Sequence, residues 1–230
     1  MVVRNSDPVR QDVTRPPIEF IEYSWIWQWF GCLSSGLAYM HNQGIRHQDI
    51  KPSNIIHRRQ RIFFTDFSSS SRFDIGRTTS TENPARISAM YGAPEVVQSL
   101  QDNSDFRKHG RGTDIFSLGC VFLEMLTVID GRLIDDFYEF CLATSTSPKR
   151  PTRLGANNFP GNFLYSRAVN LVPYWFDNSP YTVKSFLQEC IMPMLLPERM
   201  ERPSASDVSR KVRERSPWFT VHKSYCCCEE

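Results

Sequence analysis

The stretch His47-Gln48-Asp49-Ile50-Lys51-Pro52-Ser53-Asn54, followed downstream by Asp66-Phe67-Ser68, decides how this 230-residue chain is interpreted. Two short apolar runs, 54–57 and 61–65, lie between these segments, and three polar residues separate the runs. This pattern predicts a small β-hairpin. Because a hairpin returns the chain to its starting point, the second segment is expected beside the first.

The residue types in these two segments suit the transfer of a phosphoryl group. A carboxylate such as Asp49 can orient an attacking hydroxyl, and a cation such as Lys51 can neutralise the moving phosphate. Asp66 and Asn54 offer the carboxylate and amide oxygens that Mg²⁺ prefers. Either acidic residue alone would be interpreted as a solvated loop carboxylate or a helix cap, but the combination indicates chemistry.

Five ordered landmarks resemble the eukaryotic protein kinase family. The two segments above are similar to its HRDxKxxN catalytic loop and DFG metal loop. Tyr91-Gly92-Ala93-Pro94-Glu95 resembles its APE segment, and residues 114–119 resemble the start of its buried central helix. Arg202 stands where the family's late arginine pairs with Glu95. The resemblance covers about residues 20–215 and is specific because the motifs are ordered and correctly linked.

The resemblance implies a role for each candidate residue. Asp49 would be the catalytic base, and Lys51 would contact the transferred phosphate and so bind ATP as well. Asn54 and Asp66 would hold the magnesium ions, and Ile56 would form part of the floor under the adenine. The implied cofactors are ATP and Mg²⁺.

The same resemblance favours the serine/threonine class. Lys51, two residues after the aspartate, follows the serine/threonine pattern, and Ser88 matches a hydroxyl residue that such kinases aim at the catalytic loop. His47 and Phe67 would stack in the core column that links the two lobes of a kinase. The implied partner is therefore a protein substrate with a serine or threonine acceptor.

Two residues depart from the family pattern. Gln48 replaces the arginine that a phosphorylated activation loop usually contacts, so we expect no ordinary activation through Thr78, Thr79, Ser80 or Thr81. Ser68 replaces the glycine of DFG, which removes backbone freedom and costs roughly 1 kcal/mol if a glycine conformation is needed. Neither change removes a metal ligand.

The largest departure concerns the small lobe, which needs roughly 60 residues for five strands and a helix. Only about 20 residues precede the first expected helix, and the sequence has no GxGxxG loop or VAIK-like lysine. The sequence therefore predicts the large, C-terminal lobe of a kinase, with the small lobe missing. The 230-residue chain alone is expected to have weak activity or none. A separate small-lobe or regulatory partner is also expected. A catalytically silent binding module and a non-functional fragment are the alternatives.

The expected fold is mainly α with one small β-hairpin. Residues 1–19 would be a disordered remnant, 20–215 the kinase-like lobe and 216–230 a tail. Apolar spacing predicts a helix over 22–42, stopped at Gly44, and a helix over 114–126 buried on every side and capped by Asp114. Further expectations are loops over 68–94 and 145–160, a helical region over 183–195, and a last helix through Arg215 capped by Ser204 or Ser206.

Composition narrows the remaining possibilities. With 40% hydrophobic residues, 23% charged residues and a net charge of +2, the chain resembles a globular domain and suggests no nucleic-acid partner. No run approaches the roughly 18 apolar residues of a membrane span, and the charged, proline-containing start is unlike a signal peptide. A cytoplasmic or nuclear location is expected.

The cysteines and histidines give no clear metal site. Four scattered cysteines are expected as unpaired core thiols: Cys32, Cys120, Cys141 and Cys190. The adjacent Cys226, Cys227 and Cys228 are assigned to a disordered tail, with acylation and zinc binding as alternatives. Four histidines lack ligand spacing and are expected as surface or core residues: His41, His57, His109 and His222.

Overall fold

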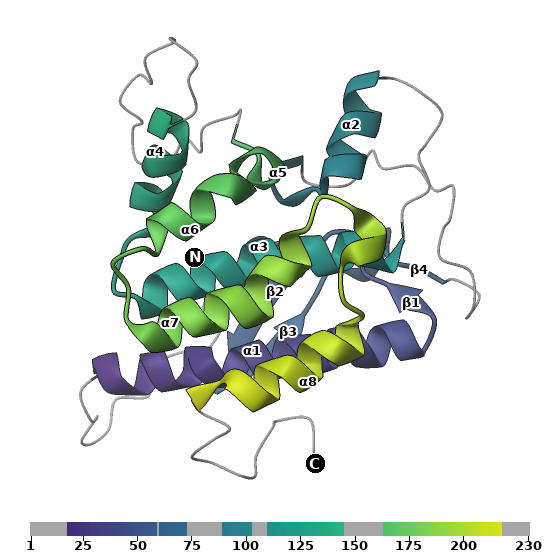
Figure 1. Ribbon diagram of the computed structural model, residues 1–230. Coiled ribbons are helices and arrows are strands. Elements are labelled where there is room, and N and C mark those ends of the chain that lie inside the picture. Colours follow the sequence, from purple (N-terminus) through teal and green to yellow (C-terminus); the bar gives the residue numbers. More distant parts are fainter. Residues whose placement is uncertain (1–17, 59, 73–88, 103–109, 145–162, 218–230) are drawn as a thin grey trace.

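The computed structural model of the chain describes residues 18–58, 60–72, 89–102, 110–144 and 163–217 (Figure 1). These residues form a mostly helical body with two small two-stranded sheets. The α-helices are α1 (Ile18–Asn42), α2 (Pro94–Asp102), α3 (Arg111–Ile129), α4 (Ile134–Thr144), α5 (Tyr165–Ala168), α6 (Val172–Trp175), α7 (Tyr181–Phe186) and α8 (Ala205–Arg215). The expected fold class, a helical kinase-like lobe with a small hairpin, is confirmed.

Helix α3 is the central element of the core. Every residue from Thr113 to Thr127 is buried, because apolar side chains point from this helix in all directions. By length and composition α3 could cross a membrane, but 83% of its apolar window is buried inside the protein. A Cβ atom at Gly119 would lie 2.9 Å from Leu195 Cδ2, so glycine allows α3 to approach the segment that contains Leu195 closely.

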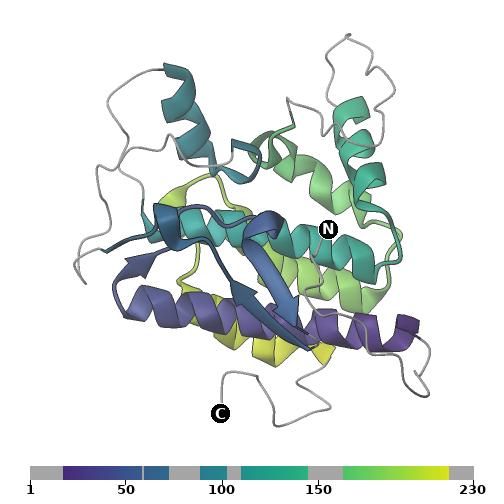
Figure 2. The same cartoon turned by 180° about the vertical axis from the view of Figure 1, so that it is seen from behind.

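Helices α1 and α8 lie side by side (Figures 1 and 2), and α1 also contacts α3. A hydroxyl contact of 2.9 Å between Ser35 and Ser209 joins them. Helix α1 begins at Ile18, four residues before its expected start, and ends at Asn42. Gly44 follows with φ 71°, a left-handed conformation that glycine adopts without strain, so the expected stop is confirmed.

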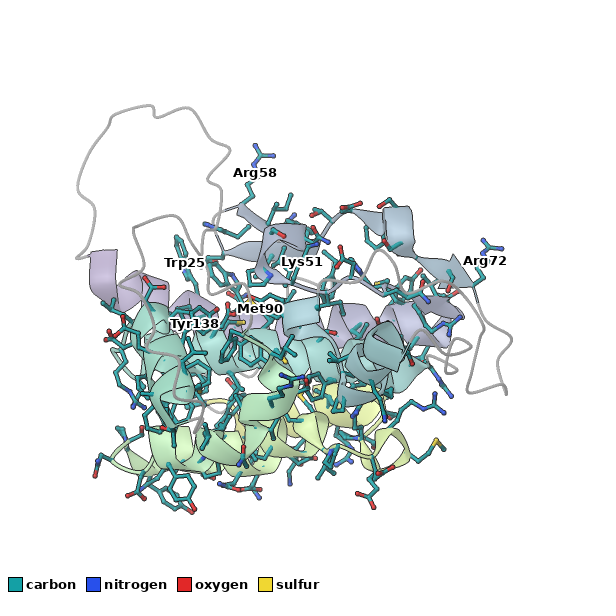
Figure 3. The ribbon with its side chains drawn as sticks, turned by 90° about the horizontal axis from the view of Figure 1, so that it is seen from above. Trp25, Lys51, Arg58, Arg72, Met90 and Tyr138 are labelled. Atoms are coloured by element: carbon teal, nitrogen blue, oxygen red, sulfur yellow. The ribbon has the colours of Figure 1, made fainter. Side chains whose placement is uncertain are left out.

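The expected hairpin is confirmed as strands β2 (Ile55–Arg58) and β3 (Arg61–Phe64). They pair antiparallel, with Ile55 opposite Phe64. A second sheet pairs β1 (Ile45–Arg46) with β4 (Ser71–Arg72). Both sheets lie on one side of the molecule, in front of α1 and α3 in Figure 2. Their basic residues Arg58 and Arg72 point outward (Figure 3).

The expectation of a featureless loop over 68–94 is wrong at both ends. The 3₁₀ turn η2 (Phe67–Ser69) leads into β4, which pairs with β1, the strand that precedes the hairpin in the sequence. The 3₁₀ turn η4 (Ala89–Tyr91) precedes α2 at the other end. A two-residue strand carries too little periodicity to be seen in the sequence, so only the pairing partner reveals it.

The late helices agree with the sequence in place but not in detail. The helical region expected over 183–195 begins at Tyr181 with α7 and continues through a π-helical turn, η6 (Leu187–Ile191), and the 3₁₀ turn η7 (Met192–Leu195). Ser204 is the N-cap of α8, since its Oγ accepts from the backbone N–H of Asp207 at 3.1 Å. Ser206 lies inside that helix.

Four expected core thiols are confirmed, because Cys32, Cys120, Cys141 and Cys190 are buried and are not joined in disulfides. Several other expectations fall outside the described residues. They concern the ends 1–17 and 218–230, the loop 145–160, Ser88, His109, His222, the cysteines 226–228 and the hydroxyl residues 78–81.

Candidate active site

Asp49 lies in the loop between β1 and the 3₁₀ turn η1 (Pro52–Asn54), and only 7% of it is exposed. Lys51 Nζ donates to Asp49 Oδ2 at 2.7 Å. A quarter of the lysine side chain is exposed (25%), so its ammonium group reaches the carboxylate from the solvent side. Asp49 and Lys51, predicted as the catalytic pair, are therefore in direct contact.

The amide of Asn54 is fixed by Asp49. Asn54 Nδ2 donates to the backbone oxygen and to Oδ2 of Asp49, both at 2.9 Å. Because both N–H bonds of the amide point toward Asp49, the carbonyl oxygen of the side chain is the group that can coordinate a cation. The expected metal ligand thus also holds the catalytic loop in its bent shape.

Asp66 reaches the same region because of the hairpin. The backbone N–H of Thr65 donates to the backbone oxygen of Asn54 at 2.9 Å, which extends the pairing of β2 and β3 by one step. Asp66 then adopts a left-handed backbone conformation, φ 56° and ψ 70°, which is uncommon for a residue other than glycine. Its side chain is exposed.

Ser68 controls the carboxylate of Asp66. Ser68 Oγ donates to Asp66 Oδ1 at 2.6 Å, and the backbone N–H of Ser68 donates to the same oxygen at 3.4 Å. These bonds lower the pKa of Asp66, the hydroxyl more than the amide, and the charges of Lys51 and His47 lower it further. The carboxylate is therefore held ionised, as a metal ligand must be.

The chain meets the chemical requirements of a magnesium site in part. Within the described ranges, no group of three His, Cys, Asp or Glu residues is arranged to hold a metal ion by itself. Asp66 and Asn54 supply one carboxylate and one amide oxygen, the hard ligands that Mg²⁺ uses together with water and substrate phosphates. These residues fit a metal ion that arrives with a nucleotide.

The aromatic contacts around His47 agree with the expected column. The rings of His47 and Phe67 lie 5.2 Å apart between centroids, and His47 also lies 5.5 Å from Phe64. Phe67 is half exposed (51%), so it presents an apolar surface on the hairpin side. Ile56, expected under the adenine, is 41% exposed on β2 opposite Phe63, which is 46% exposed.

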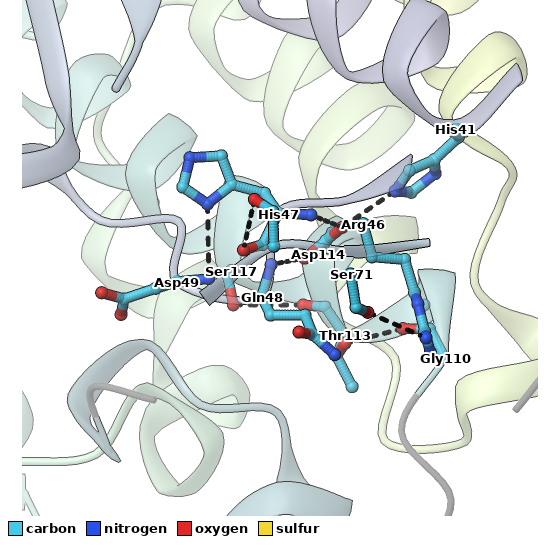
Figure 4. A network of polar contacts seen from close by, with 12 residues as sticks. His41, Arg46, His47, Gln48, Asp49, Ser71, Gly110, Thr113, Asp114 and Ser117 are labelled. Atoms are coloured by element: carbon cyan, nitrogen blue, oxygen red, sulfur yellow. Dashed lines mark hydrogen bonds and ion pairs between the residues drawn. The ribbon is translucent and has the colours of Figure 1, made fainter. Parts of the chain in front are cut away.

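Asp114 links the catalytic loop to the core, and its expected role as a helix cap is wrong. Helix α3 begins three residues earlier, at Arg111, with Gly110 at the N-cap. Asp114 Oδ2 accepts from the backbone N–H of His47 at 2.9 Å and contacts His41 Nε2 at 2.9 Å. Oδ1 accepts from the backbone N–H of Gln48 at 2.8 Å (Figure 4).

The electrostatics of Asp114 explain why a fully buried carboxylate is stable there. Burial opposes ionisation, but the bond to His41 and the N–H groups of Gln48 and His47 outweigh it and lower the pKa. Gln48 adopts φ 67°, so its backbone N–H turns toward the carboxylate although the residue is not glycine. The catalytic loop is thus held to α3 through its backbone N–H groups at His47 and Gln48.

The expected pair between Glu95 and Arg202 is confirmed. Arg202 Nη1 and Nη2 donate to the two carboxylate oxygens of Glu95, each at 2.8 Å. The same guanidinium donates to the backbone oxygens of Gly112, Leu196 and Pro197 at 2.7 to 2.9 Å. Because the donors of Arg202 reach three separate segments of the chain, this pair holds the fold, as expected.

Sequence reasoning missed the carboxyl group of Glu124. It lies toward the C-terminal end of α3 with 2% exposure, and its Oε1 accepts from the hydroxyls of Tyr91, Tyr138 and Tyr165 at 2.6, 2.8 and 2.7 Å. Burial raises the pKa of Glu124, and the three phenols oppose that rise. A charged residue inside a helix that is apolar on all sides was the signal that could have revealed it.

Known proteins similar to this chain are protein kinases. Over 92 residues, 40% of this chain, it is 39% identical to a mitogen-activated protein kinase kinase kinase, bck1, of Aspergillus fumigatus. It is 37% identical over 108 residues to the MAP kinase kinase kinase wis4 of Schizosaccharomyces pombe, covering 41% of this chain. It is 29% identical over 143 residues to the mitogen-activated protein kinase mpkC of Aspergillus oryzae, covering 60% of this chain.

These alignments span only part of each relative: 5% of bck1, 7% of wis4 and 37% of mpkC. The family model described as "Protein kinase domain" matches residues 15–212, most of the chain. That range contains the contact between Asp49 and Lys51, the hairpin that returns to Asp66, and the pair of Glu95 with Arg202. The chain belongs to the protein kinase domain family.

Proposed function

We propose that this chain carries the catalytic half of a serine/threonine protein kinase, which transfers a phosphoryl group from Mg-ATP to a protein. The observation that carries the proposal is the contact set of Asp49, which is reached by Lys51 at 2.7 Å and by Asn54 at 2.9 Å. A carboxylate, a cation and an amide converge there on one point, as phosphoryl transfer requires.

Each side chain has a distinct task in this proposal. Asp49 Oδ2 is engaged by Lys51 and Asn54, so the carboxylate is held in one orientation toward the acceptor hydroxyl. Lys51 is partly exposed and can move its ammonium group from Asp49 toward the transferred phosphate. Asn54 and Asp66 hold Mg²⁺, which neutralises charge on the phosphates.

The serine/threonine class is supported by Lys51, which follows the catalytic aspartate by two residues. It is also supported by the names of the relatives, several of which are described as MAP kinase kinase kinases. A protein with a serine or threonine acceptor is accordingly the substrate class that we propose. Ser88, which lies outside the described residues, remains a candidate for contact with the acceptor.

The second half of the nucleotide site must come from a small lobe, in this polypeptide or in another. The 230 residues contain no glycine-rich loop and no lysine in a VAIK-like setting. The exposed apolar side chains Ile56, Phe63 and Phe67 on the hairpin and metal loop would be covered by such a lobe. Without one, we expect the 230-residue chain to transfer phosphate weakly or not at all.

The test uses protein isolated from its native cells with an antibody against the α8 segment, because this material keeps any further domain. Its mass on a denaturing gel is compared with the 26.7 kDa of the chain. Transfer of γ-phosphate from Mg-ATP to a mixed protein substrate is then measured, with phosphoamino acid analysis of the product. We expect phosphoserine and phosphothreonine and a mass well above that of the chain.

Two tagged variants expressed in the same cells complete the test. Asp49→Asn should lower the rate by about 10²-fold or more, because the acceptor hydroxyl loses its orienting carboxylate. Asp135→Asn, an exposed carboxylate in α4, should leave the rate unchanged. Equal rates for the two variants would contradict the catalytic assignment.

A catalytically silent binding module is the second candidate. It is favoured by Gln48 and Ser68, the two departures from the family pattern. It would be supported if the native protein had the mass of the chain, transferred no phosphate, and still held a partner through repeated purification.

A further inference from the structure

The four consecutive serines 68–71 form a connected structure on the catalytic loop. Ser68 Oγ donates to Asp66 Oδ1 at 2.6 Å, and Ser70 Oγ donates to the backbone oxygen of His47 at 3.3 Å. Ser71 Oγ accepts from Arg46 Nη2 at 3.0 Å. Three hydroxyls of this low-complexity run therefore contact Asp66, the catalytic loop and the strand that leads into that loop.

The backbone of this run reinforces the side-chain bonds. Arg46 and Ser71 are opposite each other in the pairing of β1 with β4, and the Arg46 side chain is almost fully buried, with 1% of the residue exposed. The backbone N–H of Ser70 donates to the backbone oxygen of Phe67 at 3.0 Å and closes the η2 turn. The segment after Asp66 is thus anchored at both of its ends.

The anchoring acts on one oxygen of Asp66. Both bonds from Ser68 fall on Oδ1, and the N–H bond closes a short turn over the aspartate. A carboxylate held through one oxygen keeps the other, Oδ2, in a defined direction. Because the Asp66 side chain is exposed, water and rotation would otherwise spread it over several rotamers.

We propose that Ser68 is a positioning residue that presents Asp66 Oδ2 to the metal ion, with Ser70 and Ser71 anchoring the segment to the catalytic loop. Ser68, Ser70 and Ser71 are together called the serine clasp. The inference rests on the proposed function, in which Asp66 is a metal ligand. Serine at position 68 thereby adds a contact to Asp66, because the glycine of the family pattern has no hydroxyl with which to hold the carboxylate.

The neighbouring residue supplies a matched control. Ser69 lies between the bonding serines in the same η2 turn, and its hydroxyl is not part of the clasp. Ser69→Ala removes the same atom as Ser68→Ala, one residue away. Ser68→Thr keeps a hydroxyl, and Asp66→Asn removes the charge of the metal ligand.

The experiment titrates Mn²⁺ in the presence of ATP into the full ¹⁵N-labelled chain and its variants, and records paramagnetic broadening of amide resonances. The signals of interest are the backbone amide of Asp66 and the side-chain amide of Asn54. Ser68→Ala should need roughly three- to tenfold more Mn²⁺ for the same broadening, since it loses a hydrogen bond to a charged group. Ser68→Thr and Ser69→Ala should match the wild-type chain.

A metal-free measurement makes the contact itself visible. The ¹³Cγ shift of Asp66 should change in Ser68→Ala and stay close to the wild-type value in Ser69→Ala. Thermal unfolding of all variants should be nearly the same, because Ser68 is exposed, so a loss of metal affinity would not reflect a loss of fold.

The outcomes separate this inference from the proposed function. If Asp66→Asn abolishes the local broadening but Ser68→Ala does not weaken it, the positioning role is overturned and the metal ligand stands. If the broadening does not depend on Asp66, the metal role of the proposed function fails and the inference fails with it. An unchanged ¹³Cγ shift in Ser68→Ala would contradict the contact on which the clasp is built.

Discussion

Two fully buried carboxyl groups on helix α3 have opposite acid–base behaviour. Asp114 and Glu124 lie about three turns apart and are 1% and 2% exposed. The pKa of Asp114 is lowered, whereas burial raises the pKa of Glu124. Burial is the same, so the difference must come from the groups that donate hydrogen bonds.

The two carboxyl groups differ in the hydrogen-bond donors that they contact and in the segments that these donors connect to α3. Asp114 accepts from two backbone N–H groups and contacts a histidine, a set that stabilises negative charge and fixes the catalytic loop. Glu124 accepts from three phenols, which draw η4, α4 and α5 onto α3 but compensate less of the desolvation. Asp114, at the end of α3 that contacts the catalytic loop, is thus an ionised carboxylate. Glu124, toward the other end, is a buried polar group that joins three segments to the helix.

The largest expected effect comes from Asp114→Asn. The amide keeps one oxygen, but its NH₂ group must face a donor that Asp114 now satisfies, so a buried donor loses its partner. We expect the free energy of unfolding to fall by about 3 to 5 kcal/mol, in the range for breaking a buried charged contact. Urea denaturation measures it, and Asp135→Asn, on the exposed side of α4, should change stability by less than about 0.5 kcal/mol.

The dependence of stability on pH tests whether Asp114 is ionised in the folded chain. Because the folded-state pKa of Asp114 lies below its ordinary value of 3.8, its contribution is present above that pH and is lost as the pH falls below it. Stability of the wild-type chain should therefore drop more steeply below pH 3.8 than that of Asp114→Asn. Parallel profiles would show that Asp114 is not ionised in the fold.

A smaller effect is expected from Tyr138→Phe at the other end of the helix. This change removes one of the three hydroxyls from Glu124 and keeps the ring, which packs 4.9 Å from Phe163 between centroids. Because Tyr91 and Tyr165 still donate, the carboxyl group keeps partners, and we expect a loss of about 1 kcal/mol. Urea denaturation checks this, and a loss as large as that of Asp114→Asn would refute the distinction between the two ends.

The sequence revealed the parts of the site that are close together along the chain. Asp49, Lys51 and Asn54 lie within six consecutive residues, and the hairpin brings Asp66 back by local pairing. Apolar residues on all sides also identified α3 as the central helix. The contact of His47 with Phe67 and the pair of Glu95 with Arg202 followed from the family pattern.

The sequence did not reveal contacts that depend on the folded core. The two backbone partners of Asp114 are 66 and 67 residues away, so its position near the start of a helix suggested a cap instead. The tyrosines that reach Glu124 are 14, 33 and 41 residues away. Hydroxyl bonds of the serine clasp were missed for a different reason, since a run of four serines carries no periodicity that points to a partner.

The smallest and most discriminating effect is expected from Glu124→Gln. An amide oxygen can still accept from the tyrosines, and a neutral group has no charge to desolvate, so stability near pH 5 should change by less than about 1 kcal/mol. Because the folded-state pKa of Glu124 lies above its ordinary value of 4.5, wild-type stability should decline as the pH rises from that value through the folded pKa. The amide variant has no such decline, so its stability relative to the wild-type chain, measured by urea denaturation, should increase over the same pH range. A constant difference across that range would show that the phenols stabilise the carboxylate as fully as backbone N–H groups and His41 do for Asp114, and the contrast between the two ends of α3 would disappear.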